Sequence, residues 1–496
     1  MCIFSVDPTG RSDNSPTRSS SPEAISSFED WCEASPTLSD EIRRTVDALM
    51  VVASVQRSEG GIIESCSEAD LILSKTEDIT MIGSGIKDLR PLESFTQLRR
   101  LDLKDNQITD ISFLSNLVNL SILNLEGNQI TDIGAIQYLE NLTVLNLNGN
   151  PILNLEAIKD LTKLGHLEAL GIPVDHNKLY VFEKLRDLYV LKLSETQIEE
   201  IDFLSNHPNL NTLFIRDSSV KDISIVAYLS DLKVVDFSGN PIQDITPLLN
   251  LSIQDLSLAR NKVRILPASA SSMKINNSLR SLDINDNNIE DISLLINSKK
   301  LVYLNLCNNN LSSISEVSAL EKLTHISLCS NRISDISPIS ELKKLQIINL
   351  DYNPIQDLSP LSRLENLTHL SLKSVGIESI ESLGKLARYK ESHGFRTTFH
   401  HLDLSDNQVS DLTPLEYFDR IETLNISYNL IRDITPLANL NISDLNLSTN
   451  QITDLEALRS LNIEFTLDLR NNPIDLENCP ISSPNPEETG FKCYFD

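Results

Sequence analysis

The stretch LRRLDLKDNQITDISFLSNLVN (residues 98–119) is followed at once by LSILNLEGNQITDIGAIQYLEN (residues 120–141), which has the same hydrophobic skeleton. Both open with the pattern L-x-x-L-x-L-x-x-N, and this pattern returns about every 22 residues through most of the chain, giving 18 copies. A period sustained over so many copies indicates a repeat array. Thirteen copies end the pattern on asparagine: Asn106, Asn128, Asn150, Asn240, Asn261, Asn287, Asn309, Asn331, Asn353, Asn407, Asn429, Asn450 and Asn472.

Each copy predicts one short strand followed by one tight outer turn. In the x-L-x-L-x segment the leucines alternate with polar residues, so one face enters a core and the other faces solvent. The asparagine turns inward and satisfies buried backbone groups, and the stacked amides form a ladder. The second half of the copy reads I-x-D-I-[ST]-P-L, which leaves room only for a 3₁₀ turn, with the aspartate capping it. The sequence therefore predicts an α/β solenoid, a horseshoe with a parallel sheet on its concave face, short 3₁₀ turns on its convex face and a small helical N-terminal cap.

Five copies replace the asparagine, and two intervals are longer than the others. Serine or threonine can partly take over the amide's role, whereas Ile172 and Val375 cannot, so we expect irregular units there. The substituted positions are Ser84, Ile172, Thr196, Ser218 and Val375. Extra residues lie around 388–398 and 268–276. They predict loops on the rim of the solenoid, which either contact a partner or are tolerated drift.

The flanks of the array have their own character. Residues 1–26 are rich in serine and proline and predict a disordered tail. Residues 27–75 are expected to form the helical N-terminal cap, with one helix over 39–55 that begins at an N-cap Ser39 and another over 67–73. The array itself spans 76–474, and residues 475–496 form a C-terminal cap.

Charge and hydropathy narrow the possible partners. The net charge is −28 and the pI about 4.7, which argues against nucleic acid because phosphate binding needs clustered lysine and arginine. No apolar run approaches the roughly 18 residues that a membrane span requires, and the first residues show no signal peptide. The expectation is a cytoplasmic monomer, or a secreted or cell-surface protein if the native start differs.

The seven cysteines are placed unevenly. Cys32 and Cys66 precede the repeats and Cys479 and Cys493 follow them, so each pair is a possible disulfide that would staple one cap and require an oxidising compartment. Cys307 and Cys329 fall in the same outward column of adjacent copies, where two exposed thiols are favoured over a bond. None forms a C-x-x-C pair, so a zinc site is not supported.

The unit L-x-x-L-x-L-x-x-N-x-I-x-D-I-x-P-L resembles the SDS22-like class of leucine-rich repeats, which bacterial internalins and a eukaryotic regulator of protein phosphatase 1 share. The resemblance covers residues 79–474. The opening FEDWC (28–32), the CSEA at 66–69 and the ending NPI (472–474) with KCYF (492–495) are similar to the caps of internalin-like bacterial proteins, notably those of cyanobacteria. This resemblance implies binding of a protein through the concave face, without catalysis and without a cofactor.

One outward column of the sheet stands out among mostly small polar positions. In consecutive copies it presents five large side chains, and interfaces favour such rigid amphipathic anchors. We interpret this row as the centre of a contact surface, although the residues could merely be tolerated there: Tyr303, His325, Ile347, His369 and His401. Phe214 and Arg216, near Arg186 and Lys192, form a weaker second candidate.

The sequence shows no sign of an active site. It contains no P-loop, no H-E-x-x-H and no Ser/His/Asp arrangement, no acidic column accompanies the histidines as metal ligands, and the residues after 474 leave no room for a catalytic domain. We expect no enzyme, no metal and no cofactor. The expected function is an internalin-like scaffold that binds a partner protein through the concave face, and the alternative is a cytoplasmic regulatory subunit of a protein phosphatase.

Overall fold

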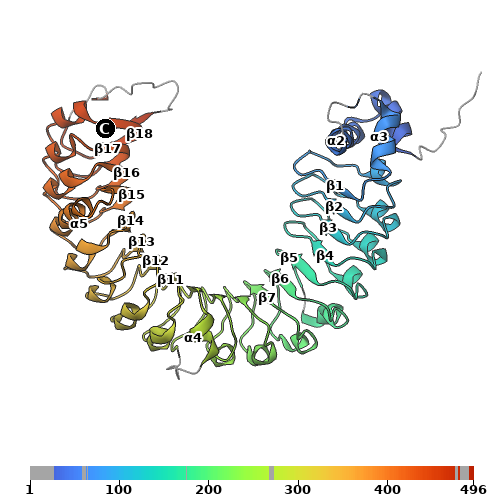
Figure 1. Cartoon of the computed structure of the whole chain (residues 1–496), viewed down its shortest axis with the longest axis horizontal. Helices are drawn as coiled ribbons and strands as arrows, with labels where there is room; N and C mark the ends of the chain where they lie inside the picture. The colour runs from blue at the N-terminus through green and yellow to red at the C-terminus, as the bar shows by residue number, and fades with distance from the viewer. Residues whose placement is uncertain are drawn as a thin grey trace, which may run out of the picture.

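The computed structural model is an open horseshoe, with strands along its inner side and helical turns along its outer side (Figure 1). It describes residues 27–57, 63, 65–174, 176–266, 273–474, 479–480 and 491–495. The predicted tail over 1–26 lies outside these residues. The expected fold, a solenoid with a concave parallel sheet and a helical N-terminal cap, is confirmed.

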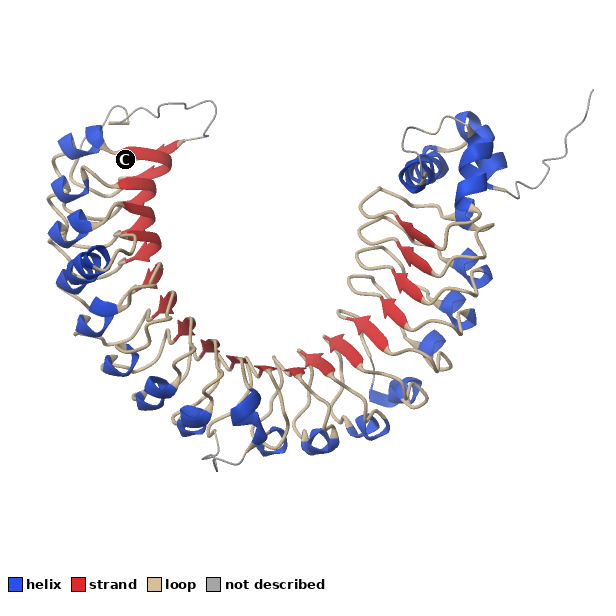
Figure 2. Ribbon diagram, in the orientation of Figure 1, coloured by secondary structure: helices blue, strands red, loops and turns tan. Residues whose placement is uncertain are grey.

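A parallel sheet of 19 strands lines the concave face, and each strand pairs in register with the next along the chain (Figure 2). Most strands have three residues, centred on the first of the two core residues in the x-L-x-L-x segment. The strands are Asp78–Thr80 (β1), Arg100–Asp102 (β2), Ile122–Asn124 (β3), Val144–Asn146 (β4), His166–Ala169 (β5), Val190–Ser194 (β6), Thr212–Arg216 (β7), Val234–Asp236 (β8), Asp255–Ser257 (β9), Ser281–Asp283 (β10), Tyr303–Asn305 (β11), His325–Ser327 (β12), Ile347–Asn349 (β13), His369–Ser371 (β14), Thr398–Asp403 (β15), Arg420–Asn425 (β16), Asn441–Asn446 (β17), Asn462–Asp468 (β18) and Lys492–Tyr494 (β19). The 18 copies supply β1 to β18, and β19 extends the sheet into the segment assigned to the C-terminal cap.

The convex face is built from 3₁₀ turns, as the short second half of each copy requires. An aspartate before the turn caps it: Asp110 Oδ1 accepts from Ser112 N at 2.8 Å, and Asp335 does the same for Ser337 N at 2.8 Å. The turns of the repeats are Arg90–Leu92 (η2), Ser112–Asn116 (η3), Gly134–Tyr138 (η4), Glu156–Ile158 (η5), His176–Phe182 (η6), Asp202–Asn206 (η7), Ser224–Tyr228 (η8), Thr246–Leu248 (η9), Ser293–Asn297 (η10), Ser315–Ala319 (η11), Ser337–Ile339 (η12), Ser359–Arg363 (η13), Thr413–Tyr417 (η14), Thr435–Leu437 (η15) and Glu456–Ser460 (η16). The turn Ser35–Thr37 (η1) lies before the repeats, in the N-terminal cap.

The asparagines lie buried at the inward bend and join neighbouring repeats. Asn128 shows the arrangement: its Nδ2 donates to Leu125 O at 2.9 Å in its own repeat and to Leu103 O at 3.0 Å in the preceding one, while its Oδ1 accepts from Ile108 N at 3.0 Å. The other twelve make equivalent bonds to the preceding repeat. One side chain therefore pairs buried donors and acceptors on two layers at once.

The ladder changes its chemistry where asparagine is missing. Thr196 and Ser218 hydrogen-bond to each other through their hydroxyls at 2.7 Å. In the unit of Val375, Asn407 Oδ1 accepts from three successive amides, those of Val375, Gly376 and Ile377, at 3.2, 2.9 and 3.2 Å. This unit is irregular because its own turn has no asparagine. The side-chain oxygen of Asn407, from the next repeat, therefore accepts all three of these backbone hydrogen bonds.

Three helices close the N-terminal end of the core: Phe28–Ala34 (α1), Asp40–Gln56 (α2) and Cys66–Leu73 (α3). The sequence reasoning missed α1, although its capping box was present: Ser27 Oγ accepts from Asp30 N, and Asp30 Oδ2 accepts from Ser27 N, both at 3.1 Å. Ser39 does precede α2, but its side chain makes no cap hydrogen bond. The Cys32–Cys66 disulfide ties α1 to α3.

The insertion around 388–398 was expected as a rim loop, and this prediction was wrong for residues 388–392. Together with the preceding residues they form the helix Glu381–Ser392 (α5), which replaces the 3₁₀ turn on the convex side (Figure 1). A helix results because Leu383, Leu386 and Ala387 recur at helical spacing and are all buried. The insertion near 268–276 contains the short helix Lys274–Ser278 (α4), and residues 267–272 lie outside the described part of the chain.

Candidate protein-binding surface

The five predicted residues form a continuous line across the sheet, which we call the concave row: Tyr303, His325, Ile347, His369 and His401. They are register partners on five adjacent strands, β11 to β15. Tyr303 is 36% exposed and the other four are partly exposed. Neighbouring strands lie about 4.8 Å apart, so the row is about 19 Å long.

Two ring contacts involve residues of the row. The rings of Tyr303 and His325 lie 6.3 Å apart, and the ring of His369 lies 5.4 Å from that of His400. His400 was not singled out from the sequence, because it stands one residue before the column. Its neighbour His401 belongs to the row, so two consecutive histidines of β15 lie next to His369 on β14.

Two histidines of the row are held by one ring nitrogen only. Nδ1 of His325 bonds to Thr324 Oγ1 at 2.7 Å, and Nδ1 of His369 bonds to Thr368 Oγ1 at 3.0 Å. In the described part of the chain no hydrogen bond engages Nε2 of either ring, which leaves it available to an incoming group. Burial, followed by the imidazoles at 400 and 401, lowers the pKa of His369, so the neutral ring, which can both donate and accept, is favoured.

In the N-terminal half of the same face, ion pairs join side chains of neighbouring strands. Lys104 Nζ lies 3.0 Å from Glu126 Oε1, and Asn146 Nδ2 donates to Glu126 Oε2 at 2.9 Å. A second network surrounds Glu168, which accepts from His166 Nε2 at 2.9 Å and Lys192 Nζ at 2.7 Å. These bonds lower the pKa of Glu168 to about 2, so this carboxylate is already satisfied.

The second candidate from the sequence, Phe214 and Arg216 on β7, belongs to this internally paired half. Arg216 forms an ion pair with Asp236 at 2.6 Å, and its guanidinium stacks over the Phe214 ring at 4.5 Å. The ammonium group of Lys192 on β6 also lies near the Phe214 ring, 5.2 Å from its centroid. Arg186 is exposed and lies before β6, outside the strand. The structure brings Phe214, Arg216 and Lys192 together but leaves Arg186 apart.

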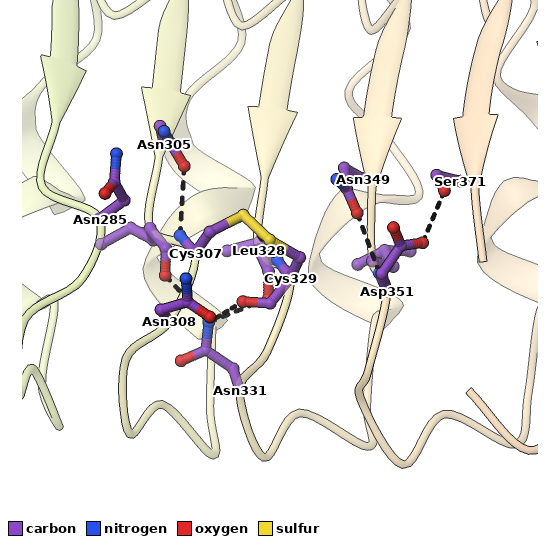
Figure 3. The surroundings of a disulfide bond; sticks show 12 residues. Asn285, Asn305, Cys307, Asn308, Leu328, Cys329, Asn331, Asn349, Asp351 and Ser371 are labelled. Atoms are coloured by element: carbon purple, nitrogen blue, oxygen red, sulfur yellow. Dashed lines mark hydrogen bonds between the residues drawn. A yellow bond between two sulfur atoms is a disulfide. The ribbon is translucent and has the colours of Figure 1, made fainter. Parts of the chain in front are cut away.

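Cys307 and Cys329, which follow β11 and β12 in the chain, form a disulfide (Figure 3). The preference for two exposed thiols was wrong: Cys307 is buried, and register pairing of β11 with β12 brings the two Cα atoms to 4.5 Å, within reach of a bond. The bond joins the repeats that carry Tyr303 and His325. The two cap pairs, Cys32–Cys66 and Cys479–Cys493, are also disulfides.

Among the described residues, no group of three or more histidine, cysteine or acidic side chains is placed to hold a metal ion. No helix in the described residues has the length and apolar character that crossing a bilayer would need.

Family models match the repeats at several places. The model for leucine-rich repeats in two copies matches residues 96–138, 118–163, 321–363 and 400–439, and a single-repeat model matches residues 276–294. The chain is a leucine-rich-repeat protein. No curated protein matches it.

Solved structures of the same fold come from bacteria and plants. An internalin, InlF, from Listeria monocytogenes is 29% identical, with 69% of this chain and 92% of that chain covered and a TM-score of 0.52. A leucine-rich-repeat protein of Leptospira interrogans is 23% identical over 84% of this chain and 100% of its own, with a TM-score of 0.57. The plant peptide hormone receptor RGFR1, solved in complex with RGF2, is 21% identical, with 81% of this chain and 71% of that chain covered and a TM-score of 0.56. The protein is thus structurally similar to bacterial internalins, while its place in the SDS22-like class stays a prediction.

Proposed function

We propose that this array binds a partner protein through its concave face, with the concave row at the centre of the contact, and that it acts by binding rather than by catalysis. Leucine-rich repeats stack into extended curved surfaces of the kind that repeat proteins use for binding. Here the row spans five adjacent repeats in register, which gives a partner one rigid, continuous line to contact.

The observation that carries this proposal is the contrast between the concave row and the ion-paired side chains of the N-terminal half of the face. In the N-terminal half, Glu126, Glu168 and Asp236 are engaged by cations or amides of neighbouring strands. A partner would have to break these pairs and would gain little in return. The row presents an aromatic ring, an aliphatic side chain and imidazoles, which can be covered without breaking an internal ion pair.

The chemistry of the row indicates what its partner presents. Tyrosine and histidine offer apolar ring faces with polar edges, and such groups carry much of the binding energy in protein interfaces. A complementary surface would place apolar side chains against Ile347 and hydrogen-bonding groups against the free Nε2 atoms of His325 and His369. A strongly basic partner is not required, because the row itself bears no carboxylate.

We further propose that the protein works in an oxidising compartment outside the cytoplasm, the alternative that the sequence left open. Three disulfides support this: Cys32–Cys66, Cys307–Cys329 and Cys479–Cys493. Disulfides persist in secreted and cell-surface proteins and are rare in the cytosol. The competing idea, a cytoplasmic phosphatase regulator in the SDS22-like manner, requires these cysteines to be free thiols.

Photo-crosslinking tests the binding proposal. A photoreactive amino acid replaces Ile347 in the row, and a matched variant carries it at Tyr228, which is 80% exposed on the convex side. Each variant is irradiated with a preparation of cell-surface proteins. The proposal expects a discrete product from position 347 that is missing at position 228. Equal products from both positions, or a product only from 228, would contradict it.

Alkylation of the native protein before unfolding, followed by mass spectrometry, tests the compartment separately. The proposal expects Cys32 and Cys66 to resist the reagent and to be recovered as one crosslinked peptide. Full labelling of both cysteines in protein from its native source would favour the cytoplasmic alternative.

A further inference from the structure

A cleft of about 600 Å³ lies beside the row, where the end of α5 meets the starts of β15 and β16. We call it the α5 cleft, and ligand pockets commonly have about this volume. Its floor and walls include Lys390, Phe395, Arg396, His400 and Arg420. The insertion that creates α5 supplies the first three of them, so the cleft is a local addition to the regular repeat.

Positive charge is concentrated in this cleft, although the chain carries a net charge of −28. Lys390, Arg396 and Arg420 line it, against two carboxylates, Glu365 and Glu422. Distant acidic residues weigh little here, since charges more than roughly 8 Å away are largely screened at physiological salt. With Lys390 protonated, the three cations that line the cleft exceed its two lining carboxylates by one charge.

The ammonium group of Lys390 is buried without a carboxylate partner. The residue is only 2% exposed, and its Nζ donates to Leu367 O at 2.9 Å. Burial lowers the pKa of Lys390 to about 8, and no acidic side chain in the described part of the chain offsets this effect. The partners of this cation are the Leu367 carbonyl and, 5.7 Å away, the Phe399 ring, and neither carries a negative charge. An anion brought next to the ammonium would supply one.

The guanidinium groups are also only partly used. Arg420 Nε is buried without a hydrogen bond and lies 3.4 Å from Glu422 Oε1, while its Nη2 donates to Ser443 Oγ at 3.3 Å. Arg396 is exposed and forms no ion pair within the described residues. A guanidinium fork matches a carboxylate in two parallel hydrogen bonds.

An apolar wall stands next to these cations. Phe395 is 38% exposed and lines the cleft, so a ligand with a flat apolar body would cover a ring that otherwise faces water. Glu422 occupies part of the anion's place: it accepts from His400 Nδ1 at 2.9 Å and faces Arg420. The Glu422 carboxylate therefore competes with the carboxylate of a ligand for Arg420.

We propose that the α5 cleft is a binding site for an organic carboxylate on an apolar or aromatic body, with Arg396 and Arg420 holding the carboxylate and Phe395 contacting the body. The site is distinct from the concave row, and its existence does not depend on the partner that the row binds. Its ligand class follows from the cations, the buried ammonium and the exposed ring together.

Fluorine NMR of para-fluorobenzoate with the full chain tests this site, with para-fluorobenzamide as the neutral control of the same shape. We expect the carboxylate to bind with a Kd on the order of 1 mM, reasonable for so small a probe, and the amide to bind at least about tenfold more weakly. Equal binding of the two probes would overturn the proposal. Inorganic phosphate that binds more tightly than the carboxylate would also overturn the ligand class.

Variants give the test two opposite directions. Arg396→Ala and Arg420→Gln should each weaken binding about tenfold, because each removes a charge-assisted contact. Glu422→Gln should strengthen it severalfold, because the internal competitor is removed; a purely structural role of these residues would not produce a gain. Arg332→Ala, an exposed arginine two repeats before the cleft, should leave the Kd unchanged.

Thermal unfolding of each variant keeps the outcomes interpretable. Arg396 is exposed, so its variant is expected to melt like the parent chain, and it carries the test even if Arg420→Gln is unstable. An unchanged Kd for folded Arg396→Ala, or no gain for Glu422→Gln, would refute the assignment.

Discussion

Replacing Asn287 by alanine should lower stability far more than the same change at its neighbour Asn288. Asn287 is 8% exposed, and its Oδ1 accepts from Val263 N at 3.0 Å. Its Nδ2 donates to Leu258 O in the preceding repeat at 2.9 Å, and to Ile284 O at 3.2 Å in its own. Asn288 is exposed, and its backbone bond survives the substitution.

The magnitude follows from what alanine leaves behind. The Val263 amide loses its acceptor in a fully buried place, which costs about 1–3 kcal/mol. Leu258 O keeps a second donor, Asn261 Nδ2 at 2.9 Å, so the donated bonds cost only their net value, about 1 kcal/mol each. The sum is about 4 kcal/mol for Asn287→Ala, against about 0.5 kcal/mol or less for Asn288→Ala, a surface change.

Native-state hydrogen exchange of peptides from the two flanking repeats measures this loss locally. A decrease of about 4 kcal/mol in the free energy of opening corresponds to about a thousandfold faster exchange. Asn287→Thr should recover little of the protection, since the hydroxyl of Thr196, which fills the same position elsewhere, serves Ile198 N of its own repeat and not the preceding repeat. If both alanine variants exchanged alike, the ladder would not be the source of stability that its geometry indicates.

Three further results are expected. Glu168→Gln should destabilise the chain at neutral pH, and the difference from the parent should shrink as the pH falls from about 4.3 to 2, because a carboxylate with a lowered pKa stabilises only while it is ionised; a difference independent of pH would contradict this. Replacing Cys32 and Cys66 together by serine should lower the stability of the N-terminal cap by about 3.5–4 kcal/mol, the value expected for a disulfide that closes a 34-residue separation. Faster hydrogen exchange in the cap helices than in the repeats would show this loss, and unchanged exchange in the cap would refute it. The parent chain should gain stability relative to Lys390→Met between pH 8 and about 10.4, since the unfolded lysine still holds its proton there while the folded one has released it; denaturant unfolding at several pH values checks the sign.

The repeat made the fold predictable from the sequence alone. The spacing of leucine and asparagine gives the strand, the inward bend and the register of the sheet, and thereby places Tyr303 beside His325 without coordinates. The same logic failed at the insertion around 388–398. The helical spacing begins before residue 388, and it becomes visible only when Leu383 and Leu386 are included in the pattern. The short helix α1 was missed because seven residues give too little periodicity, although Ser27 and Asp30 formed a capping box.

Side-chain pairing was the part that sequence could not supply. The pattern placed Cys307 and Cys329 in one column, but only the 4.5 Å approach of their Cα atoms decides for a bond. The column also could not show that Phe214 and Arg216 are engaged with Asp236 and Lys192 while the row is not. The α5 cleft depends on Lys390, whose burial follows from packing of the insertion and not from any repeat position.

The affinity of the crosslinked partner for two matched triple variants tests the central claim most directly. One variant carries alanine at Tyr303, His369 and His401, and the other carries alanine at three residues of the same column in the N-terminal half, Arg100, Ile122 and Val144. With the purified partner, surface plasmon resonance should give a Kd about a hundredfold or more weaker for the row variant, as expected when hot-spot anchors are lost, and within about threefold of the parent for the other variant. Equal affinities for the two variants, or a loss confined to the N-terminal triple, would contradict the assignment of the row as the binding surface.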